Sequence, residues 1–393
     1  MRNLTIILPG LLVAATGVGA GDLITGALAG NNLGPLIILP LIGAFLKYIL
    51  TEGIARYQFA TGKPLIHGWM KELGAPFKYV FYFYLFIWAY TVGGALLNAT
   101  SSAAMLFVPL SKTALSFFFS GLAFCLVWSA RFEIFEKLMA VLIGVMFIAV
   151  IGTSFFLIES PAALMNFSRF QFSSPWFLGL IGGVGGTLTI VCYGYWLIEN
   201  QRSGEEGLRV SRLDLKVSYL LTGLFSCAMM VIGSRLPEVS KSGDVFIEQI
   251  ASLFASQIGP FAAQFFKVGF FCGVFSSLLG VWQSVPYLFA DIRLIDDHGQ
   301  QDLKTSKPYR QFLAFISLAS LTTIGLKFQS IQLLYAVTGA LAIPLCALSL
   351  IFLFRKKEIV EPFRNKVFHK ITLWSSFLFF IAYGINVVIK KFS

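Results

Sequence analysis

Charged residues are scarce in this sequence, and histidine and cysteine are scarcer still. Asp, Glu, Lys and Arg make up 12% of the 393 residues, whereas 57% are hydrophobic and the mean hydropathy is +0.78. So little charge excludes an ordinary soluble domain. The lack of a Gly-x-x-x-x-Gly-Lys-Ser/Thr motif excludes a P-loop ATPase. We therefore expect an all-α integral membrane protein, with no enzyme activity, no resident cofactor and no obligatory protein partner.

Cysteine and histidine patterns exclude further classes of site. The cysteines all lie inside apolar stretches and lack the spacing of zinc ligands or of a disulfide framework. His67, His298 and His369 fall in or beside predicted loops, which argues against a histidine metal cluster inside the membrane. The net charge of +11 does not indicate a nucleic-acid partner, because Lys and Arg are spread over short loops.

Eleven apolar stretches are long enough, at about 20 residues, to cross a bilayer as helices. They cover residues 5–30, 35–59, 77–107, 113–130, 134–158, 177–200, 214–233, 260–286, 310–326, 330–354 and 371–390. Residues 1–12 are assigned to the first helix and not to a signal peptide, because no cleavage signal precedes the glycines within that helix. The loop containing residues 245–258 is expected to form a short amphipathic helix.

The loops predict the orientation. With the N-terminus in the cytoplasm, most loop Lys and Arg fall on the cytoplasmic side, as the positive-inside rule requires. The few expected outside are Lys112, Arg169, Arg235, Lys241, Lys327, Lys390 and Lys391. We expect a multi-pass protein of the plasma (inner) membrane, with a cytoplasmic N-terminus, an extracytoplasmic C-terminus and the lipid bilayer as its partner.

A glycine-rich sequence with one carboxylate interrupts the first apolar stretch. Gly17, Gly19 and Gly21 precede Asp22 in the middle of this segment. Glycine weakens a helix by roughly 1 kcal/mol relative to alanine, and a charge at mid-bilayer costs about 2.5 to 3.5 kcal/mol or more. Small residues alone would indicate close helix packing. Helix packing does not explain the presence of Asp22. The carboxylate therefore favours the interpretation that this segment is an unwound, substrate-binding interruption.

The sixth stretch repeats this pattern. It contains Gly182, Gly183, Gly185 and Gly186, followed by Thr189. Interruptions five helices apart predict two inverted five-helix repeats, with discontinuous helices 1 and 6 meeting near the membrane midplane. The predicted boundaries are 1–160 for the first repeat, 175–355 for the second and 369–393 for an additional helix.

Other polar residues lie at membrane depth. Glu52 and Arg56 are four residues apart and are expected to form an ion pair on one helical face. Glu199 is expected near the cytoplasmic end of the sixth helix, and no function is predicted for Lys47 or Lys267. The eighth stretch has polar residues that indicate either a substrate-facing surface or hydrogen bonds between helices. They are Ser276, Ser277, Gln283 and Ser284.

Three segments and the helix order carry a family resemblance. The segments are Pro9-Gly10-Leu11-Leu12-Val13-Ala14, Ala55-Arg56 followed by Ala60-Thr61-Gly62-Lys63, and Gly185-Gly186-Thr187 in the sixth of eleven helices. In these features the chain resembles the Nramp superfamily of proton-coupled divalent-metal transporters. The resemblance implies a LeuT-like fold and a metal site between helices 1 and 6.

The sequence departs from this family at the site itself. Where such transporters carry Asp-Pro-Gly-Asn, this chain has Gly19-Ala20-Gly21-Asp22, and Thr189-Ile190-Val191 aligns with their Met-Pro-His. An acidic residue often found in their third helix is replaced around Thr91-Val92-Gly93-Gly94. Loss of the thioether favours a hard ion such as Mg²⁺ over Mn²⁺ or Fe²⁺.

Two substrates remain open at this point, a divalent cation and a small organic solute such as an amino acid or amine. For the cation, Asp22 and Thr189 are the candidate metal ligands, with carbonyl oxygens from Thr16 and Gly186. For the organic solute, the N-termini of the half-helices would bind a carboxylate. The complete candidate substrate or ion site is Thr16, Gly19, Asp22, Gly186, Thr189, Tyr193 and Gln283. Proton coupling would require Asp22 to bind a proton as the site empties.

Overall fold

The computed structural model describes residues 10, 13, 16–72, 74–129, 132–154, 156, 164–237, 239–240, 242–295, 303–356, 359 and 361–392. In these ranges the chain is helical apart from turns and one isolated antiparallel bridge between Leu36 and Met165. The first elements are η1 (Val18–Thr25), α2 (Gly26–Leu33), α3 (Ile38–Thr61), α4 (Leu65–Glu72), α5 (Ala75–Ala104), α6 (Lys112–Ser129) and α7 (Phe132–Ser154). They are followed by α8 (Pro175–Gly183), η4 (Leu188–Cys192), α9 (Tyr193–Glu199), α10 (Gly204–Ser234), α11 (Gly243–Gln257), α12 (Pro260–Leu294), η5 (Leu303–Thr305), α13 (Lys307–Leu321), α14 (Phe328–Ala340), α15 (Ala342–Leu353) and α16 (Val367–Phe392).

The helices match the predicted apolar stretches closely, and the all-α membrane architecture is confirmed. Within the described ranges, 8 helices or helix series are long and apolar enough to cross a membrane. The remaining predicted stretches fall on η1 with α2, on α7 and on α13. Residues 5–9 of the first stretch lie outside the described residues, as does His298. The count of eleven crossings and the repeat boundaries therefore stay predictions. The expected amphipathic helix is α11, Gly243–Gln257.

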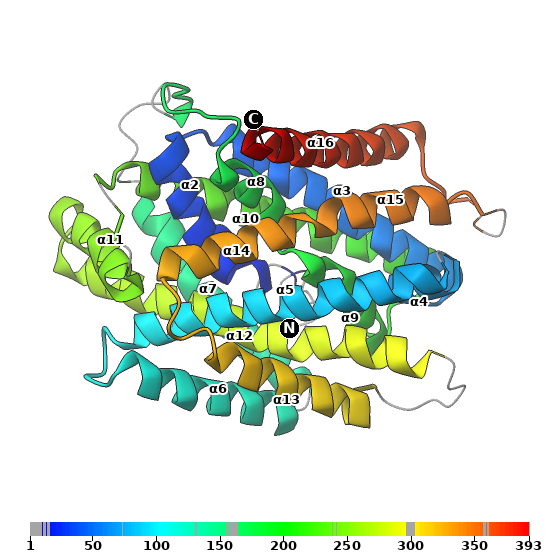
Figure 1. Ribbon diagram of the computed structural model, residues 1–393, viewed down its shortest axis with the longest axis horizontal. Coiled ribbons are helices and arrows are strands. Elements are labelled where there is room, and N and C mark those ends of the chain that lie inside the picture. Colours follow the sequence, from blue (N-terminus) through cyan, green and yellow to red (C-terminus); the bar gives the residue numbers. More distant parts are fainter. Residues whose placement is uncertain are drawn as a thin grey trace.

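The π-helix η1 lies at the centre of the bundle. It packs against α2, α5, α8, α10, α12 and α14, while α3 and α10 pack side by side (Figure 1). Helices α2 and α10 approach to backbone contact. A Cβ atom built on Gly30 would lie 2.0 Å from the Met230 carbonyl oxygen, and one on Gly233 would lie 1.9 Å from that of Ala27. Small residues permit this approach, which van der Waals packing then stabilises.

The two expected interruptions take different forms. Helix six breaks as predicted, because α8 ends at Gly183, residues 184–187 are not helical, and η4 forms a 3₁₀ turn before α9. The first interruption was expected to be unwound, and that detail is wrong. From Thr16 onward the backbone stays helical but widens into the π-helix Val18–Thr25, which includes Asp22. A π segment accommodates the glycines while keeping the main-chain groups hydrogen-bonded.

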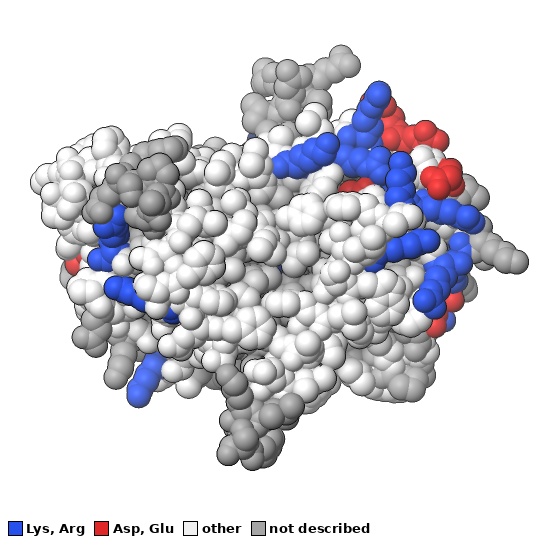
Figure 2. Space-filling view, turned by 90° about the horizontal axis from the view of Figure 1, so that it is seen from above, with Lys and Arg blue, Asp and Glu red and all other residues white. Residues whose placement is uncertain are grey.

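Charge gathers at the ends of the molecule. Figure 2 shows Lys and Arg side chains concentrated mainly at one end, with a smaller group at the opposite end and few charges between them. Large apolar side chains are exposed over the helices that form the middle, including Phe83, Phe117, Ile148, Leu220 and Leu318. This is the surface expected where lipid, not water, surrounds a helical bundle.

Gly233→Ala should destabilise the bundle, because the added methyl group would overlap the Ala27 carbonyl on α2. Overpacking of this kind costs about 1 to 3 kcal/mol, and here the obstructing atoms are backbone. The measurement is the melting temperature of purified protein in detergent, with Gly144→Ala as control because nothing lies within 4 Å of its added Cβ. Equal melting temperatures for the two variants would contradict the tight α2 to α10 contact.

Candidate functional site

Asp22 joins the two interrupted helices. Its side chain is completely buried, and its carboxylate oxygens accept hydrogen bonds from the Gly185 backbone N–H, with N to Oδ1 and N to Oδ2 distances of 3.3 and 3.2 Å. Gly185 belongs to the non-helical residues 184–187 that follow α8. A buried carboxylate requires hydrogen-bond donors, and a backbone released from helical bonding supplies one. The predicted meeting of the two interruptions is thus present.

Glycines allow the two backbones to touch. A Cβ on Gly17 would lie 2.2 Å from the Gly186 nitrogen, and one on Gly21 would lie 2.7 Å from the Gly183 carbonyl oxygen. Gly185 and Gly186 have φ angles of +70° and +94°, a left-handed conformation that side chains disfavour. The glycines at these positions are therefore required both by the close approach and by the path of the second interruption.

Hydroxyl groups lie beside the same interruptions. The Thr16 hydroxyl donates to the Val13 carbonyl oxygen at 2.8 Å, and its oxygen lies 3.3 Å from the Thr189 hydroxyl oxygen. The Gly19 N–H donates to the Ser277 hydroxyl oxygen at 2.7 Å. Of the polar residues noted in the eighth stretch, Ser277 thus contacts the first interruption.

Lys47 reaches the second interruption from α3. Its side chain is completely buried, and its ammonium donates to the Gly182 carbonyl oxygen at 2.8 Å and also to the Gly186 carbonyl oxygen. Asp22 binds the Gly185 N–H of the same segment, so the carboxylate and the ammonium both contact residues 182–186. The Gly186 carbonyl, a predicted substrate ligand, is therefore bound by an internal cation in this structure.

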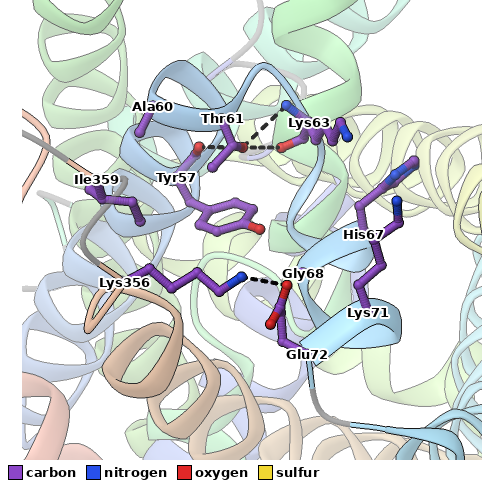
Figure 3. Close-up of a pocket in the computed structure, with 10 residues that line it drawn as sticks. All are labelled: Tyr57, Ala60, Thr61, Lys63, His67, Gly68, Lys71, Glu72, Lys356 and Ile359. Atoms are coloured by element: carbon purple, nitrogen blue, oxygen red, sulfur yellow. Dashed lines mark hydrogen bonds and ion pairs between the residues drawn. The ribbon is translucent and has the colours of Figure 1, made fainter.

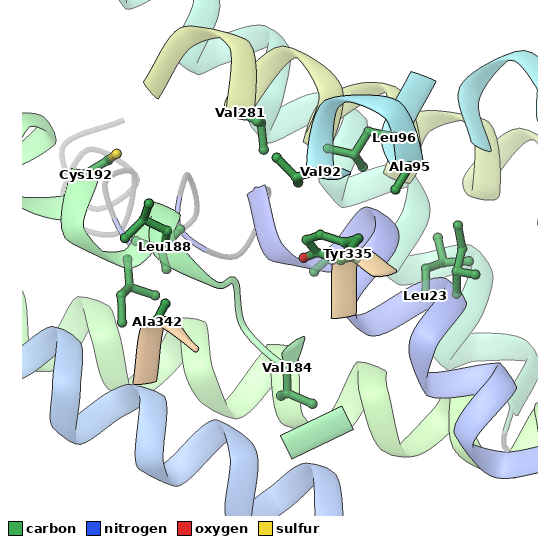
Figure 4. Packing of buried hydrophobic residues seen from close by; sticks show 14 of the residues in the cluster. Leu23, Val92, Ala95, Leu96, Val184, Leu188, Cys192, Val281, Tyr335 and Ala342 are labelled. Carbon is green, nitrogen blue, oxygen red and sulfur yellow. The ribbon is translucent and has the colours of Figure 1, made fainter. Parts of the chain in front are cut away.

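Apolar side chains enclose this polar centre. Figure 4 shows Leu23, Val184, Leu188 and Tyr335 grouped around the interruptions, and all four are buried. Such an enclosure removes water and strengthens the electrostatic interactions inside it. The arrangement gathers a carboxylate, hydroxyl oxygens and backbone carbonyl oxygens in one apolar enclosure.

Tyr193 binds a second buried carboxylate. Its hydroxyl donates to Asp214 of α10 at 3.0 Å, and Arg202 donates to the same carboxylate at 2.9 Å. The Gly10 N–H donates to both Asp214 oxygens at 3.0 Å. Asp214 therefore ties the first segment to α9, and in this structure the Tyr193 hydroxyl is directed at Asp214.

Gln283 lies at a different contact. Its side-chain oxygen accepts from the Trp196 indole N–H at 3.2 Å, which links α12 to α9. Its side-chain nitrogen is buried and finds no hydrogen-bond partner in the part of the chain that the structure describes.

A cavity of about 310 Å³ opens near the end of the molecule where α3 and α4 meet (Figure 3). It is lined by Tyr57, Ala60, Thr61, Lys63, His67, Gly68, Lys71, Glu72, Lys356 and Ile359.

The His67 ring nitrogen Nε2 lies 2.7 Å from Oδ1 of Asp291, and the Tyr195 hydroxyl donates to Oδ2 at 2.7 Å. This cluster connects α4, α9 and α12.

The predicted ion pair of α3 is confirmed. Arg56 Nε lies 2.6 Å from the Glu52 carboxylate, and both side chains are buried. Arg212 of α10 also binds Glu52, at 2.9 Å. Lys267 pairs with Glu248 at 2.7 Å, and Glu199 accepts from the Tyr287 hydroxyl at 3.0 Å.

Comparison with protein families gives one match that covers nearly the whole chain. The model of the natural resistance-associated macrophage protein-like family, Nramp, matches residues 10–390. The chain belongs to the Nramp family. Nramp proteins are membrane transporters, so the expectation that the chain is not an enzyme is confirmed. Comparison with curated proteins gave no match.

Solved structures share this Nramp fold at low sequence identity. The manganese transporter of Eremococcus coleocola, in complex with an aromatic bis-isothiourea substituted compound, is 15% identical with a TM-score of 0.75, covering 98% of this chain and 87% of that one. MhsT in complex with L-phenylalanine is 14% identical with a TM-score of 0.60, covering 98% of both chains. Mhp1, a nucleobase-cation-symport-1 family transporter, is 12% identical with a TM-score of 0.60, and the match covers 98% of this chain and 93% of that one. The LeuT-like fold is confirmed.

The residues of the candidate site were only partly predictable. Thr16, Asp22, Gly186 and Thr189 lie at the contact between the two interruptions, whereas Gly19 faces Ser277 of α12. Sequence reasoning missed the partners that come from other helices. The sequence did indicate Lys47 as unusual, because it is a lysine inside an apolar stretch without a local partner. Asp214 lies at the start of another apolar stretch, a position that gives no indication of a buried contact. Among the described residues, no group of three or more His, Cys, Asp or Glu could hold a metal ion.

Asp214→Asn should destabilise the protein strongly, because it removes the negative charge that compensates the buried Arg202. Breaking a buried ion pair costs about 3 to 5 kcal/mol. Thermal unfolding in detergent measures the effect. The matched control is Glu72→Gln, which weakens an ion pair with Lys356 whose two side chains are 38% and 35% exposed and should cost about 1 kcal/mol or less. A similarly small loss in both variants would show that Asp214 is not needed for stability.

Proposed function

We propose that this Nramp-family protein is a secondary active transporter that moves a divalent metal cation by alternating access. The observation that carries the proposal is the buried Asp22 carboxylate on the π-helix η1, which is hydrogen-bonded to the break in the sixth helix. Broken helices are where many secondary transporters bind their substrates. The likeness to a manganese transporter supports a metal substrate.

The donor atoms favour a hard ion such as Mg²⁺ over Mn²⁺ or Fe²⁺. Asp22 supplies the charge, Thr189 a hydroxyl oxygen, and Thr16 and Gly186 further oxygens, so the proposed ligand set contains only oxygen. Carboxylate, hydroxyl and carbonyl groups suit Mg²⁺ and Ca²⁺, whereas thioether and imidazole suit softer metals. Asp22 and Thr189 both lie against residues 185–186, Asp22 through its hydrogen bond and Thr189 through contact with Gly186.

Proton coupling and orientation form part of the same proposal. In the proton-coupled form of the proposal, Asp22 binds a proton as the cation leaves and releases it before Lys47 or the next cation binds beside it, so the carboxylate is neutral only while neither positive charge is present. The concentration of basic residues at one end of the molecule supports a cytoplasmic N-terminus in the plasma membrane (Figure 2).

A small zwitterion such as an amino acid is the second candidate. The observation that favours it is the presence of Lys47 and Asp22, opposite charges on either side of the second interruption. These charges match a carboxylate and an amine. The likeness to MhsT, solved with L-phenylalanine, is compatible with this alternative.

Proteoliposome uptake with Mg²⁺, Ca²⁺, Mn²⁺ and a mixture of amino acids separates the two candidates. Uptake of a divalent cation that amino acids do not inhibit supports the metal. Amino-acid uptake without any response to divalent cations would replace the metal proposal with the zwitterion.

Asp22→Asn should abolish binding of the transported cation while the protein still folds. The amide keeps the side-chain shape but removes the charge. Isothermal titration calorimetry with the cation found in the uptake panel measures binding, and size-exclusion chromatography reports folding. Glu248→Gln is the control, since it neutralises a carboxylate remote from the site. Near-normal affinity in Asp22→Asn would remove Asp22 from the mechanism.

Thr189→Met should shift selectivity toward Mn²⁺ or Cd²⁺, because a thioether replaces a hydroxyl oxygen beside the second interruption. The measurement is the ratio of Mn²⁺ to Mg²⁺ uptake in proteoliposomes, expected to rise about tenfold for a preference worth roughly 1.4 kcal/mol. Thr322→Met, at an exposed position, is the control. An unchanged ratio in a folded Thr189→Met variant would contradict the assignment of Thr189 as a ligand.

A further inference from the structure

Lys47 places its ammonium against backbone carbonyl oxygens at the second interruption. Its ammonium donates to the carbonyl oxygens of Gly182 and Gly186, which lie at the end of α8 and in the non-helical residues that follow. Carbonyl oxygens released from helical hydrogen bonding are typical ligands for inorganic cations. The structure therefore shows a carbonyl site for a cation, filled by a side chain of the protein itself.

The neighbouring residues fix Lys47 in this position. One helical turn earlier on α3, a Cβ on Gly43 would lie 3.1 Å from the Ile181 carbonyl oxygen, so the two backbones pass closely. One turn later, the Thr51 hydroxyl lies 2.6 Å from that of Tyr219, whose ring packs against Gly185. The Lys47 side chain is thus confined to a short, dry space between α3 and the interruption.

The charges of the site are balanced in this arrangement. Asp22 binds the Gly185 N–H while Lys47 binds the carbonyls on either side of it, so one carboxylate and one ammonium compensate each other. Addition of a divalent cation to the same dry space would leave a net positive charge, which is strongly unfavourable without water.

We infer that Lys47 is a tethered competitor of the transported cation. Its ammonium fills the carbonyl site in the unloaded protein, and the cation must displace it in order to bind between Asp22 and Gly186. This inference rests on the proposed function, because it takes the transported substrate to be a divalent cation. Because the ammonium returns when the cation leaves, the carbonyls stay bound and the empty carrier keeps its two interruptions packed together. Lys47 thereby sets the affinity and permits the empty carrier to reorient.

The first test compares cation binding in Lys47→Met and Lys47→Arg with the wild type. Methionine removes the charge and keeps a similar volume, so the dissociation constant of the transported cation should fall about tenfold or more. Arginine keeps the charge and should not tighten binding. Lys267→Met, which removes a lysine paired with Glu248, is the matched control and should leave the affinity unchanged.

Transport measurements distinguish a Lys47 that competes with the cation from a Lys47 that only stabilises the fold. Exchange of cation for cation does not require the empty carrier to reorient, whereas net uptake does. Lys47→Met should therefore retain exchange and lose most of its net uptake. A folded variant with unchanged or weaker cation binding, or with equal loss of exchange and net uptake, would overturn the inference.

A second test does not depend on the transported substrate. Lys47→Ala leaves room for the missing propyl chain and ammonium, so propylammonium at millimolar concentration should raise its melting temperature by about 2 °C or more. Neither the wild type nor Lys267→Ala should respond. Absence of this rescue in a folded Lys47→Ala variant would overturn the carbonyl cation site, even if the uptake panel had already excluded a divalent metal.

Discussion

The contact between the Asp22 carboxylate and the Gly185 N–H determines most of the architecture around it. A completely buried charge needs a donor, and a backbone N–H is free to serve only where helical hydrogen bonding has stopped. That requirement accounts for the non-helical residues after α8 and for the left-handed conformations of Gly185 and Gly186. It also accounts for Gly17 and Gly21, where a Cβ would collide with the opposite backbone. The buried charge, the glycines and the interruption are consequences of one constraint.

Buried ionic contacts then fix the half-helices to the surrounding bundle. Lys47 of α3 binds the end of α8, whereas Asp214 of α10 binds Tyr193 of α9 and the Gly10 N–H. Glu52 joins α3 to α10 through Arg212. Because lipid provides little hydrophobic drive for helices to associate, such directional contacts select one arrangement among many of similar packing energy. The short helices flanking the interruption are therefore positioned by charges on α3 and α10 as well as by apolar packing.

Local patterns in the sequence predicted where the backbone could not remain an ordinary helix. The glycines before Asp22 and those around Gly185 identified both interruptions, and the spacing of Glu52 and Arg56 predicted their ion pair. The π geometry of the first interruption was not predictable, because it depends on how η1 packs against six other helices. The partners of Lys47 lie 135 and 139 positions away, and the Gly10 N–H reaches Asp214 across 204 positions. Partner choice at such separations is a property of the tertiary fold.

The departure from the family pattern has a structural explanation. The resemblance places an aspartate where this chain has Gly19, yet a Cβ at that position would lie 2.5 Å from Ser277 on α12. The Gly19 N–H also uses the Ser277 hydroxyl as its acceptor. The acidic side chain is instead three residues later, on the surface of η1 that faces Gly185. The acid on η1 therefore faces the second interruption, where Asp22 binds the Gly185 N–H and Lys47 binds the carbonyl oxygens of Gly182 and Gly186. The displaced acid and the buried lysine thus contact one segment of the chain.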